Sequence, residues 1–350
     1  MSRVLIAGSG RMGRDLGLWL LRQGHQVHWV SRHPSRLEAL RAQVERVLRR
    51  WQREGSAAGA AAAVTFGTPA SLASLDVPDL MIEAVEEEAA AKRAVLAWAD
   101  VWAPRQPLLL STTSSFLPRH LHPRCVVTHF FFPVELTGIV EVVWPSAVTG
   151  HDRERLHELL RPSRVYVIEQ TDRQAFAVNR LLLPAHAECV RLVRLGLAPA
   201  LADQAAATGL LGVAPLALAQ RVGLTTMRAA LANYVAVATG AEDYHELVQA
   251  LAEDGDPAPT AAAMGAGLSL ADASDVQQAV QLNTCLRFVQ EDLISEPDLD
   301  WLLPNFYGRA STLATALEPC DRQRLAARLR TLHRQTGRQY FEPAESLKAT

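Results

Sequence analysis

Two residues in the stretch 126–141, which reads VVTHFFFPVELTGIVE, could together perform proton chemistry. His129 and Glu141 each lie in a short apolar, β-branched run of the kind that forms buried strands. If the two strands are neighbours, the carboxylate can fix the tautomer of the imidazole and stabilise its protonated form, which makes the histidine a usable base near neutral pH. The alternative is a core histidine with satisfied hydrogen bonds, which is the commoner use of a histidine in such a strand.

A glycine-rich turn follows the first apolar strand pattern of the chain. The turn GSGRMG (8–13) comes directly after VLIA and opens a predicted helix over 15–23. In this context Gly8 allows the tight turn, Gly10 lets the backbone approach a pyrophosphate, and Gly13 permits close packing of helix on strand. The pattern predicts a βαβ unit that binds a dinucleotide at the N-terminus of the helix.

The end of the second strand distinguishes between the two nicotinamide cofactors. An NAD-binding unit usually has an acidic residue there, hydrogen-bonded to the adenosine ribose, but this chain has Ser31 and Arg32. A neutral side chain followed by a guanidinium suits a 2′-phosphate, so we favour NADP(H) over NAD(H). NAD(H) stays open, because Arg32 can equally be a solvated loop residue.

Polar residues gather at the ends of two further predicted strands. The run DLMIEAV (79–85) is followed by three glutamates and a helix with Lys92, and the strand 108–110 is followed by STTSS (111–115). Doubly wound sheets bind ligands at the carboxyl ends of their strands, although hydroxyls can also simply cap a turn. Lys92 is one of only two lysines among 35 basic residues, which suggests that its position requires a compact ammonium.

The order of these elements predicts an α/β fold, a doubly wound, mostly parallel Rossmann sheet followed by an all-helical region. A strand near 165–168 is expected to close the sheet, and only helices are expected beyond residue 171, beginning with a long one over 174–197. A stretch rich in Asp, Pro, Ala and Gly, 254–267, is typical of a connector between two helical blocks. We therefore expect a dinucleotide-binding domain and two helical domains, at 1–173, 174–266 and 267–350.

Composition limits the class of protein. A chain of 350 residues with 49% hydrophobic and 21% charged residues can bury a sizeable core, and a formal net charge of -2 argues against a nucleic-acid binder. The four cysteines have no metal-ligand spacing, and no apolar stretch is long enough for a membrane span. We expect a soluble cytoplasmic protein without a bound metal.

Taken together, the motifs resemble the 3-hydroxyacyl-CoA dehydrogenase family. The resemblance covers nearly the whole chain. The C-terminal stretch of the chain resembles the end of the second helical repeat of multifunctional fatty-acid oxidation enzymes. The matching stretches, in family order, are GSGRMG (8–13), IEAVEEEAAAK (82–92), STTSS (111–115), THFFFPVELTGIVEVV (128–143), VNRLLLPAHAE (178–188), GLLGVAPLALAQRVGL (209–224) and TGRQYFEPAESLKA (336–349).

The resemblance implies a nicotinamide-dependent dehydrogenase that acts at C3 of a 3-hydroxyacyl or 3-oxoacyl thioester. It implies that His129 is the general acid or base and that Glu141 orients it, while Ser114 and Asn179 hold the C3 oxygen of the substrate. Glu87, Lys92 and Thr112 would lie near the nicotinamide ribose. The remaining residues expected at the cofactor are Gly8, Gly10, Met12, Gly13, Ser31, Arg32 and Ala84.

Departures from the family pattern concern residues beside the site. Phe132 stands where the family has the asparagine of HFFNP, and Thr112 stands where it has the asparagine of SNTSS. These positions indicate a substrate or cofactor geometry different from that of β-oxidation enzymes, and Phe132 is the first place to look for a difference in what the protein accepts.

Alternatives remain for the partner of this chemistry. Arg46, Arg49, Arg50 and Arg53 recur on one face of a helix predicted over 35–53, where they could dock an acidic acyl carrier protein or form an ordinary solvated face. A non-catalytic dinucleotide-binding relative is the alternative of another class. Because two helical blocks can bury in one chain what single-block relatives bury between subunits, we expect a chain able to exist as a monomer, with a homodimer as the alternative.

Overall fold

A computed structural model describes residues 1–56, 63–161, 165–172, 176–235, 241–252, 267–309 and 311–348. The chain divides into two compact units, Met1–Ala175 and Phe176–Thr350. The division of the second unit into separate domains before and after residue 266 stays a prediction. The connector predicted over 254–267 lies, apart from its last residue, outside the described residues.

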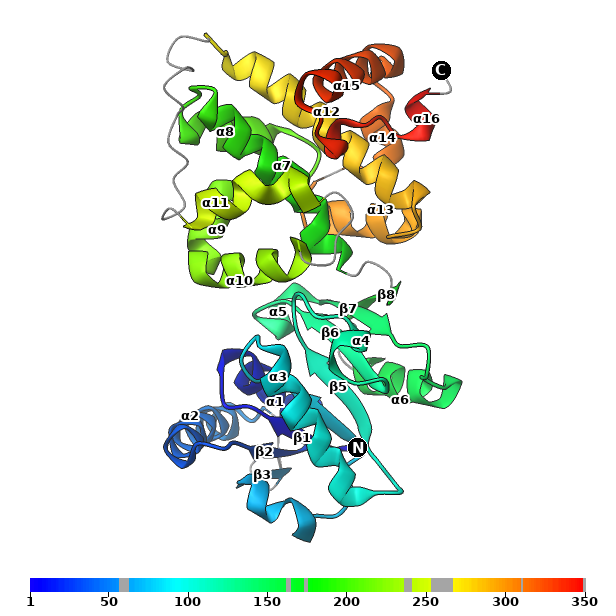
Figure 1. Ribbon diagram of the computed structural model, residues 1–350. Coiled ribbons are helices and arrows are strands. Elements are labelled where there is room, and N and C mark those ends of the chain that lie inside the picture. The colour runs from blue at the N-terminus through cyan, green and yellow to red at the C-terminus, as the bar shows by residue number, and fades with distance from the viewer. Residues whose placement is uncertain are drawn as a thin grey trace. The chain divides into compact units, whose positions relative to one another are not determined.

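The first unit is built on one sheet, whose eight described strands follow the order β3-β2-β1-β4-β5-β6-β7-β8 (Figure 1). Neighbouring strands are parallel, except that β6 and β7 are antiparallel. This confirms the predicted doubly wound, mostly parallel sheet, and the expected closing strand is β8 at its edge. The strands are Arg3–Ala7 (β1), Gln26–Val30 (β2), Val64–Gly67 (β3), Leu80–Glu83 (β4), Leu108–Thr112 (β5), Cys125–Phe130 (β6), Ile139–Trp144 (β7) and Tyr166–Thr171 (β8).

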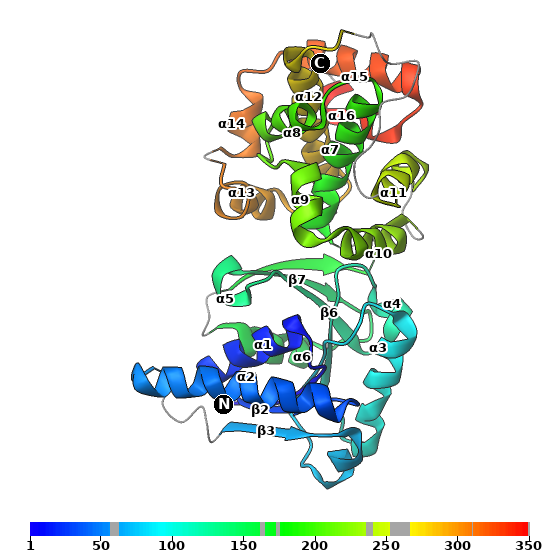
Figure 2. The same ribbon diagram turned by 90° about the vertical axis from the view of Figure 1, so that its left-hand side faces the viewer.

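Helices cover both faces of this sheet, with α1 and α2 on one face and α3 on the other (Figure 2). Central strands covered on both sides need apolar residues at consecutive positions, and β4, β5, β6 and β7 are buried along their whole length. The helices are Arg11–Arg22 (α1), Pro34–Arg53 (α2), Ala89–Leu96 (α3), Pro118–Leu121 (α4), Val134–Thr137 (α5) and Gly150–Leu160 (α6), with 3-10 turns at Pro69–Ser74 (η2) and Ala97–Trp102 (η3).

Close packing of α1 on β2 fixes the helix that follows the glycine turn. Gly17 of α1 lies against the ring of Trp29, where an added Cβ would stand only 1.9 Å from Cζ2. The indole Nε1 donates to the carbonyl oxygen of Gly13 at 3.1 Å. The start of α1 is therefore held at a set position beside the end of β1.

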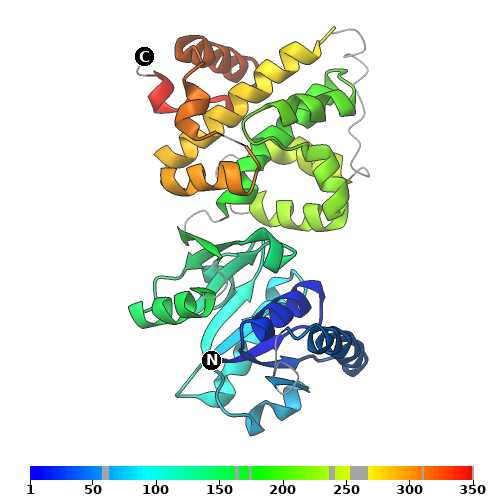
Figure 3. The same ribbon diagram turned by 180° about the vertical axis from the view of Figure 1, so that it is seen from behind.

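The second unit contains only helices among its described residues, as expected beyond residue 171 (Figure 3). The long helix predicted over 174–197 is α7. The helices are Ala177–Arg194 (α7), Pro199–Thr208 (α8), Pro215–Val222 (α9), Leu224–Val235 (α10), His245–Ala252 (α11), Leu270–Gln290 (α12), Glu296–Asn305 (α13), Leu313–Leu317 (α14), Arg322–Thr336 (α15) and Glu345–Lys348 (α16), with 3-10 turns at Ala241–Tyr244 (η5) and Gln339–Phe341 (η7).

Helix α12 forms buried hydrogen bonds with α7 and α8 and with the chain near Glu342. The amide of Gln277 donates to the carbonyl of Ala185 in α7 at 3.0 Å, and that of Gln281 donates to Ala206 in α8 at 2.9 Å. Asn283 of the same helix contacts a later part of the chain, because its amide donates to the carbonyl of Glu342 at 2.8 Å. All three side chains are at most 1% exposed, so these hydrogen bonds are made inside the core. The second block therefore packs onto the first within one unit.

Candidate active site

His129 and Glu141 lie opposite each other on adjacent strands. The antiparallel register of β6 and β7 pairs the two residues directly, and the Nδ1 atom of His129 is 2.7 Å from Oε2 of Glu141. The carboxylate is fully buried, whereas the histidine retains 8% exposure. With the carboxylate oxygen as acceptor, Nδ1–H is the donor, and this contact fixes the tautomer and the orientation of the ring.

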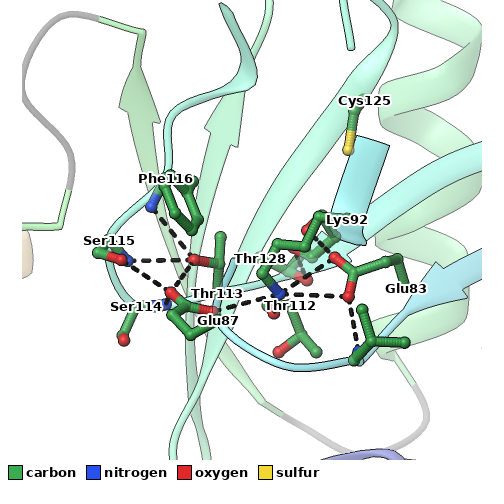
Figure 4. Close-up of polar contacts among 12 residues, drawn as sticks. Glu83, Glu87, Lys92, Thr112, Thr113, Ser114, Ser115, Phe116, Cys125 and Thr128 are labelled. Atoms are coloured by element: carbon green, nitrogen blue, oxygen red, sulfur yellow. Dashed lines mark hydrogen bonds and ion pairs between the residues drawn. The ribbon is translucent and has the colours of Figure 1, made fainter. Parts of the chain in front are cut away.

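The hydroxyl-rich turn after β5 is organised around Glu87. The Oε1 atom of this glutamate accepts hydrogen bonds from the hydroxyls of Thr113 and Ser115 and, at 3.1 Å, from the backbone N–H of Ser114 (Figure 4). The hydroxyls of 113 and 115 thus do more than cap the turn, because they bind a carboxylate from the neighbouring strand end.

Lys92 is fully buried and links this turn to the sheet. Its ammonium lies 3.2 Å from Oε2 of Glu87 and 3.2 Å from both carboxylate oxygens of Glu83, and it donates to the carbonyl of Thr112 at 3.0 Å. Figure 4 shows the ammonium between the two carboxylates. Because the side chain is 0% exposed, any influence of Lys92 on a ligand passes through these partners. Thr112 itself is buried, with 8% exposure.

The two glutamates on Lys92 have pKa values shifted in opposite directions. Desolvation raises the pKa of Glu83, against the effect of the ammonium and of the Ser111 hydroxyl. Burial would also raise the pKa of Glu87, but Lys92 and the hydroxyls of Thr113 and Ser115 outweigh it and hold that pKa below its ordinary value. Glu87 is therefore an anion at neutral pH. The sequence offered one signal for the role of Glu83, a carboxylate inside an apolar strand that needs a cation nearby.

The glycine turn borders a cavity of about 320 Å³ at the carboxyl ends of β1, β2 and β4. Gly8 has a φ of +132° and no room for a side chain, since a Cβ would lie 2.3 Å from the carbonyl oxygen of Ala84. A Cβ on Gly10 would meet nothing within 4 Å, so the backbone there is open to a ligand. Gly13 packs against Gly8 instead of facing the cavity. The expected cofactor residues that line it are Gly8, Gly10, Met12, Ser31, Arg32 and Ala84.

Charged residues line one side of this cavity. Arg32 forms an ion pair with Glu86 at 3.0 Å, and both side chains are about half exposed, with 44% and 55% of their surface accessible. His33 and Arg36 also line the cavity and were not singled out from the sequence, although they follow Arg32 closely along the chain. The residues present fit a dinucleotide, with an open glycine turn for the pyrophosphate and cations at the ribose end.

Phe132 lies on the loop that follows His129 and is 42% exposed. The guanidinium of Arg11, the first residue of α1, sits 4.7 Å from the centre of its ring, within the range of a cation–π contact. The ring of Phe131 lies 4.3 Å from that of His129. Phe132 therefore connects the loop of the histidine to the glycine turn, a contact that an asparagine could not make in this way.

Asn179 belongs to the second unit, in the first turn of α7, and is partly buried. The described residues contain no cluster of His, Cys, Asp and Glu suited to a metal ion. Within the same residues, no helix has both the length and the hydropathy needed to cross a bilayer.

The arginine-bearing face of α2 is exposed and partly neutralised along the helix. Arg49 pairs with Glu45 at 3.6 Å, and Arg50 pairs with Glu54 at 3.8 Å. Ion pairs of this spacing are typical of a solvated helix face.

A doubly wound sheet, an open glycine turn on a cavity and a histidine–carboxylate pair near the same strand ends define the class of a dinucleotide-dependent dehydrogenase. Family models agree with this class: the 3-hydroxyacyl-CoA dehydrogenase NAD binding domain matches residues 3–168, and the C-terminal domain of the same family matches residues 176–263. The chain belongs to the 3-hydroxyacyl-CoA dehydrogenase family. Its first unit is accordingly the nicotinamide-dinucleotide-binding part of an oxidoreductase.

Relatives of known name match 65% of the chain. A probable 3-hydroxybutyryl-CoA dehydrogenase of Bacillus subtilis is 27% identical over 238 residues, which are 65% of this chain and 83% of that protein. A 3-hydroxybutyryl-CoA dehydrogenase of Mycobacterium tuberculosis is 28% identical over 246 residues, covering 65% and 84%.

Among solved structures, that of 3-hydroxybutyryl-CoA dehydrogenase from Escherichia coli shares the fold over 99% of this chain and 98% of its own, with a TM-score of 0.76 and 17% identity. The dehydrogenase part of a multifunctional enzyme from C. elegans shares it over 99% and 89%, with a TM-score of 0.60 and 16% identity. The likeness of fold thus extends through the second helical block.

Proposed function

We propose that the chain transfers hydride between a nicotinamide dinucleotide and C3 of a 3-hydroxyacyl or 3-oxoacyl thioester, with His129 as the general acid or base. The observation that carries the proposal is the 2.7 Å contact between His129 and a fully buried Glu141, near the strand ends that also bear the dinucleotide turn. The names of the relatives, 3-hydroxybutyryl-CoA dehydrogenases, support the choice of substrate.

In the direction of oxidation, Nε2 of His129 takes the proton of the C3 hydroxyl while the carbon–hydrogen bond at C3 breaks. The bound nicotinamide ring supplies the acceptor for the hydride. Glu141 stabilises the imidazolium that forms, and in the direction of reduction the same imidazolium returns its proton to the C3 oxygen. Ser114 is the proposed hydrogen-bond partner of that oxygen, and the family resemblance adds Asn179.

His129→Ala tests this assignment. We expect the rate of turnover to fall about 10²–10⁴-fold, the usual contribution of a positioned acid or base, while dinucleotide affinity measured by fluorescence is unchanged. His151→Ala is the matched control, because His151 is exposed on α6 and makes no contact with the site. A His129→Ala protein that turns over at a near-normal rate would refute the assignment of the base.

The preferred cofactor in this proposal is NADP(H). The support comes from Arg32, His33 and Arg36 along one side of the cavity, where Glu86 is the one carboxylate among the described lining residues. A 2′-phosphate would replace Glu86 as the partner of Arg32 and gain a bidentate contact.

A comparison of kcat/KM for NADPH and NADH decides between the two cofactors. We expect a preference for NADPH that Arg32→Ala lowers about tenfold or more, since a hydrogen bond to a charged group is worth about 1.5–3 kcal/mol. Arg49→Ala, an arginine of the exposed α2 face, should leave the preference unchanged. A clear preference of the unaltered protein for NADH would contradict the prediction.

The acyl carrier in this proposal is coenzyme A, in line with the names of the relatives. Ion pairs along α2 leave its arginine face less suited to an acidic carrier protein. To separate the two cases, the activity on the same acyl group is compared between coenzyme A and an acyl carrier protein, at low and at high salt. Docking of an acidic carrier protein would weaken with salt.

A further inference from the structure

Three neighbouring hydroxyls, those of Thr113, Ser114 and Ser115, are used in different ways. Two of them donate to Oε1 of Glu87. Among the contacts within the described part of the chain, the Ser114 hydroxyl makes no hydrogen bond, although this residue is partly buried. Glu87 thus leaves one hydroxyl of the three available to a ligand.

The backbone of this turn is fixed at each N–H from 113 to 116. Thr113 donates to the carbonyl of Thr128 at 3.2 Å, and Ser114 donates to Glu87 at 3.1 Å. The N–H groups of Ser115 and Phe116 both donate to the Thr113 hydroxyl oxygen, at 3.2 and 3.1 Å. Thr128 is the neighbour of His129 on β6, so the hydrogen bond of Thr113, the residue before Ser114, attaches the turn to the strand of the base.

Glu87 can hold the turn in this way only if its own position is fixed. Its side chain is 26% exposed, and it is anchored by the fully buried ammonium of Lys92. Lys92 in turn holds the carbonyl of Thr112, the residue just before the turn, and is anchored by Glu83 inside the sheet. A compact ammonium with three donors suits these three partners, two carboxylates and one carbonyl, better than a planar guanidinium does, which accounts for a lysine in a chain otherwise rich in arginine.

We infer that Glu87, held by Lys92, is a positioning residue that presents the Ser114 hydroxyl to the C3 oxygen of the substrate by engaging the hydroxyls on either side of it and the N–H of Ser114 itself. This inference rests on the proposed function, because it takes Ser114 as the group that touches the substrate. The three donors of the turn share Oε1 of Glu87, while Lys92 lies against Oε2. A carboxamide has only one accepting oxygen for these two groups of donors, since its nitrogen does not accept hydrogen bonds.

A double-mutant cycle separates positioning from general structural damage. Glu87→Gln, Ser114→Ala and the double variant are compared by kcat/KM for a 3-oxoacyl thioester, with melting temperatures measured alongside. We expect Glu87→Gln alone to lower kcat/KM about tenfold, which corresponds to one well-placed hydrogen bond. In the Ser114→Ala background, the same substitution should lower kcat/KM by less than about twofold. Glu88→Gln is the control, because Glu88 is the adjacent, exposed carboxylate and its side chain caps nothing.

Ser115→Ala serves as the milder variant if Glu87→Gln does not fold, since it removes one donor to Glu87 and leaves the carboxylate in place. Its smaller loss should likewise disappear in the Ser114→Ala background. Equal losses in both backgrounds would overturn the inference while leaving the proposed function intact. A Ser114→Ala protein with unaltered kcat/KM overturns the inference and the assignment of Ser114, and an unaltered protein without turnover on any 3-oxoacyl thioester overturns the proposed function as well.

Discussion

At the scale of single residues, His129 and His186 differ in the hydrogen bonding of their rings. His129 has a buried carboxylate on Nδ1 and keeps a part of its ring exposed. His186, on α7, is 3% exposed, and its Nε2 atom has no hydrogen-bond partner within the described residues. Burial without such a partner opposes the protonation of His186 and lowers its pKa.

His186 should make the stability of the protein depend on pH. Burial lowers the pKa of His186 to about 4 from an ordinary value of 6.5, so the folded protein keeps the ring neutral where the unfolded chain protonates it. Its contribution to stability is complete above pH 6.5 and is lost as the pH falls toward 4. Between pH 7 and pH 5 the loss is about 2 kcal/mol.

Urea unfolding of the unaltered protein and of His186→Leu at these two pH values measures that loss. The variant should lose about 2 kcal/mol less between pH 7 and pH 5. His151→Ala, which alters an exposed histidine, should behave like the unaltered protein. An identical pH dependence in His186→Leu would show that the ring is not the buried, neutral group that the structure describes.

At the scale of elements, the glycines of α1 and of its preceding turn serve two separate purposes. Gly17 is required by packing, because Trp29 occupies the space of its side chain. Gly10 has space around it and a φ of -77°, which any residue can adopt. Its lack of a side chain therefore matters for a ligand, since the pyrophosphate must approach the backbone closely.

Substitution by alanine should separate these purposes. Gly17→Ala is expected to destabilise the fold by about 1–3 kcal/mol, because an overpacked core must shift to admit the methyl group. Gly10→Ala should keep its melting temperature and lose dinucleotide affinity, about tenfold or more, because the methyl group stands between backbone and pyrophosphate. Thermal melting and fluorescence titration measure the two effects, and full affinity in Gly10→Ala would contradict the assignment of the turn.

At the scale of the whole molecule, the second helical block buries apolar surface of the first within one chain. Val280 and Phe341, from α12 and η7, share a core cluster with Ala187 and Val190 of α7. On the same helix, between Ala187 and Val190, Glu188 is fully buried and accepts hydrogen bonds from Arg191 at 2.6 Å and from the hydroxyl of Tyr340 at 3.3 Å. Packing of this extent within one chain leaves less apolar surface for a partner subunit.

We therefore expect a monomer. Light scattering should give a mass near 38.2 kDa that does not change on dilution, because the burial is intramolecular and independent of concentration. Chemical unfolding should likewise be independent of protein concentration. A dimer that unfolds when diluted would show that the second block does not replace a partner subunit.

The sequence by itself determined the features that depend on neighbours along the chain. Apolar strand runs, the glycine turn and the helical periodicity beyond residue 171 predicted the fold class and the dinucleotide turn, because backbone propensity and hydrophobic period are local properties. The same reasoning placed His129 and Glu141 each in a buried strand, without deciding whether the two strands were neighbours.

Tertiary structure alone decided which side chains meet. The register of β6 on β7 sets His129 opposite Glu141, and a shift by one residue would have turned one of them to the other face of the sheet. The chain of contacts from Glu83 through Lys92 to Glu87, and that from Arg11 to Phe132, join residues on different elements. Such contacts depend on strand order and on packing across the sheet, which no local pattern in the sequence specifies.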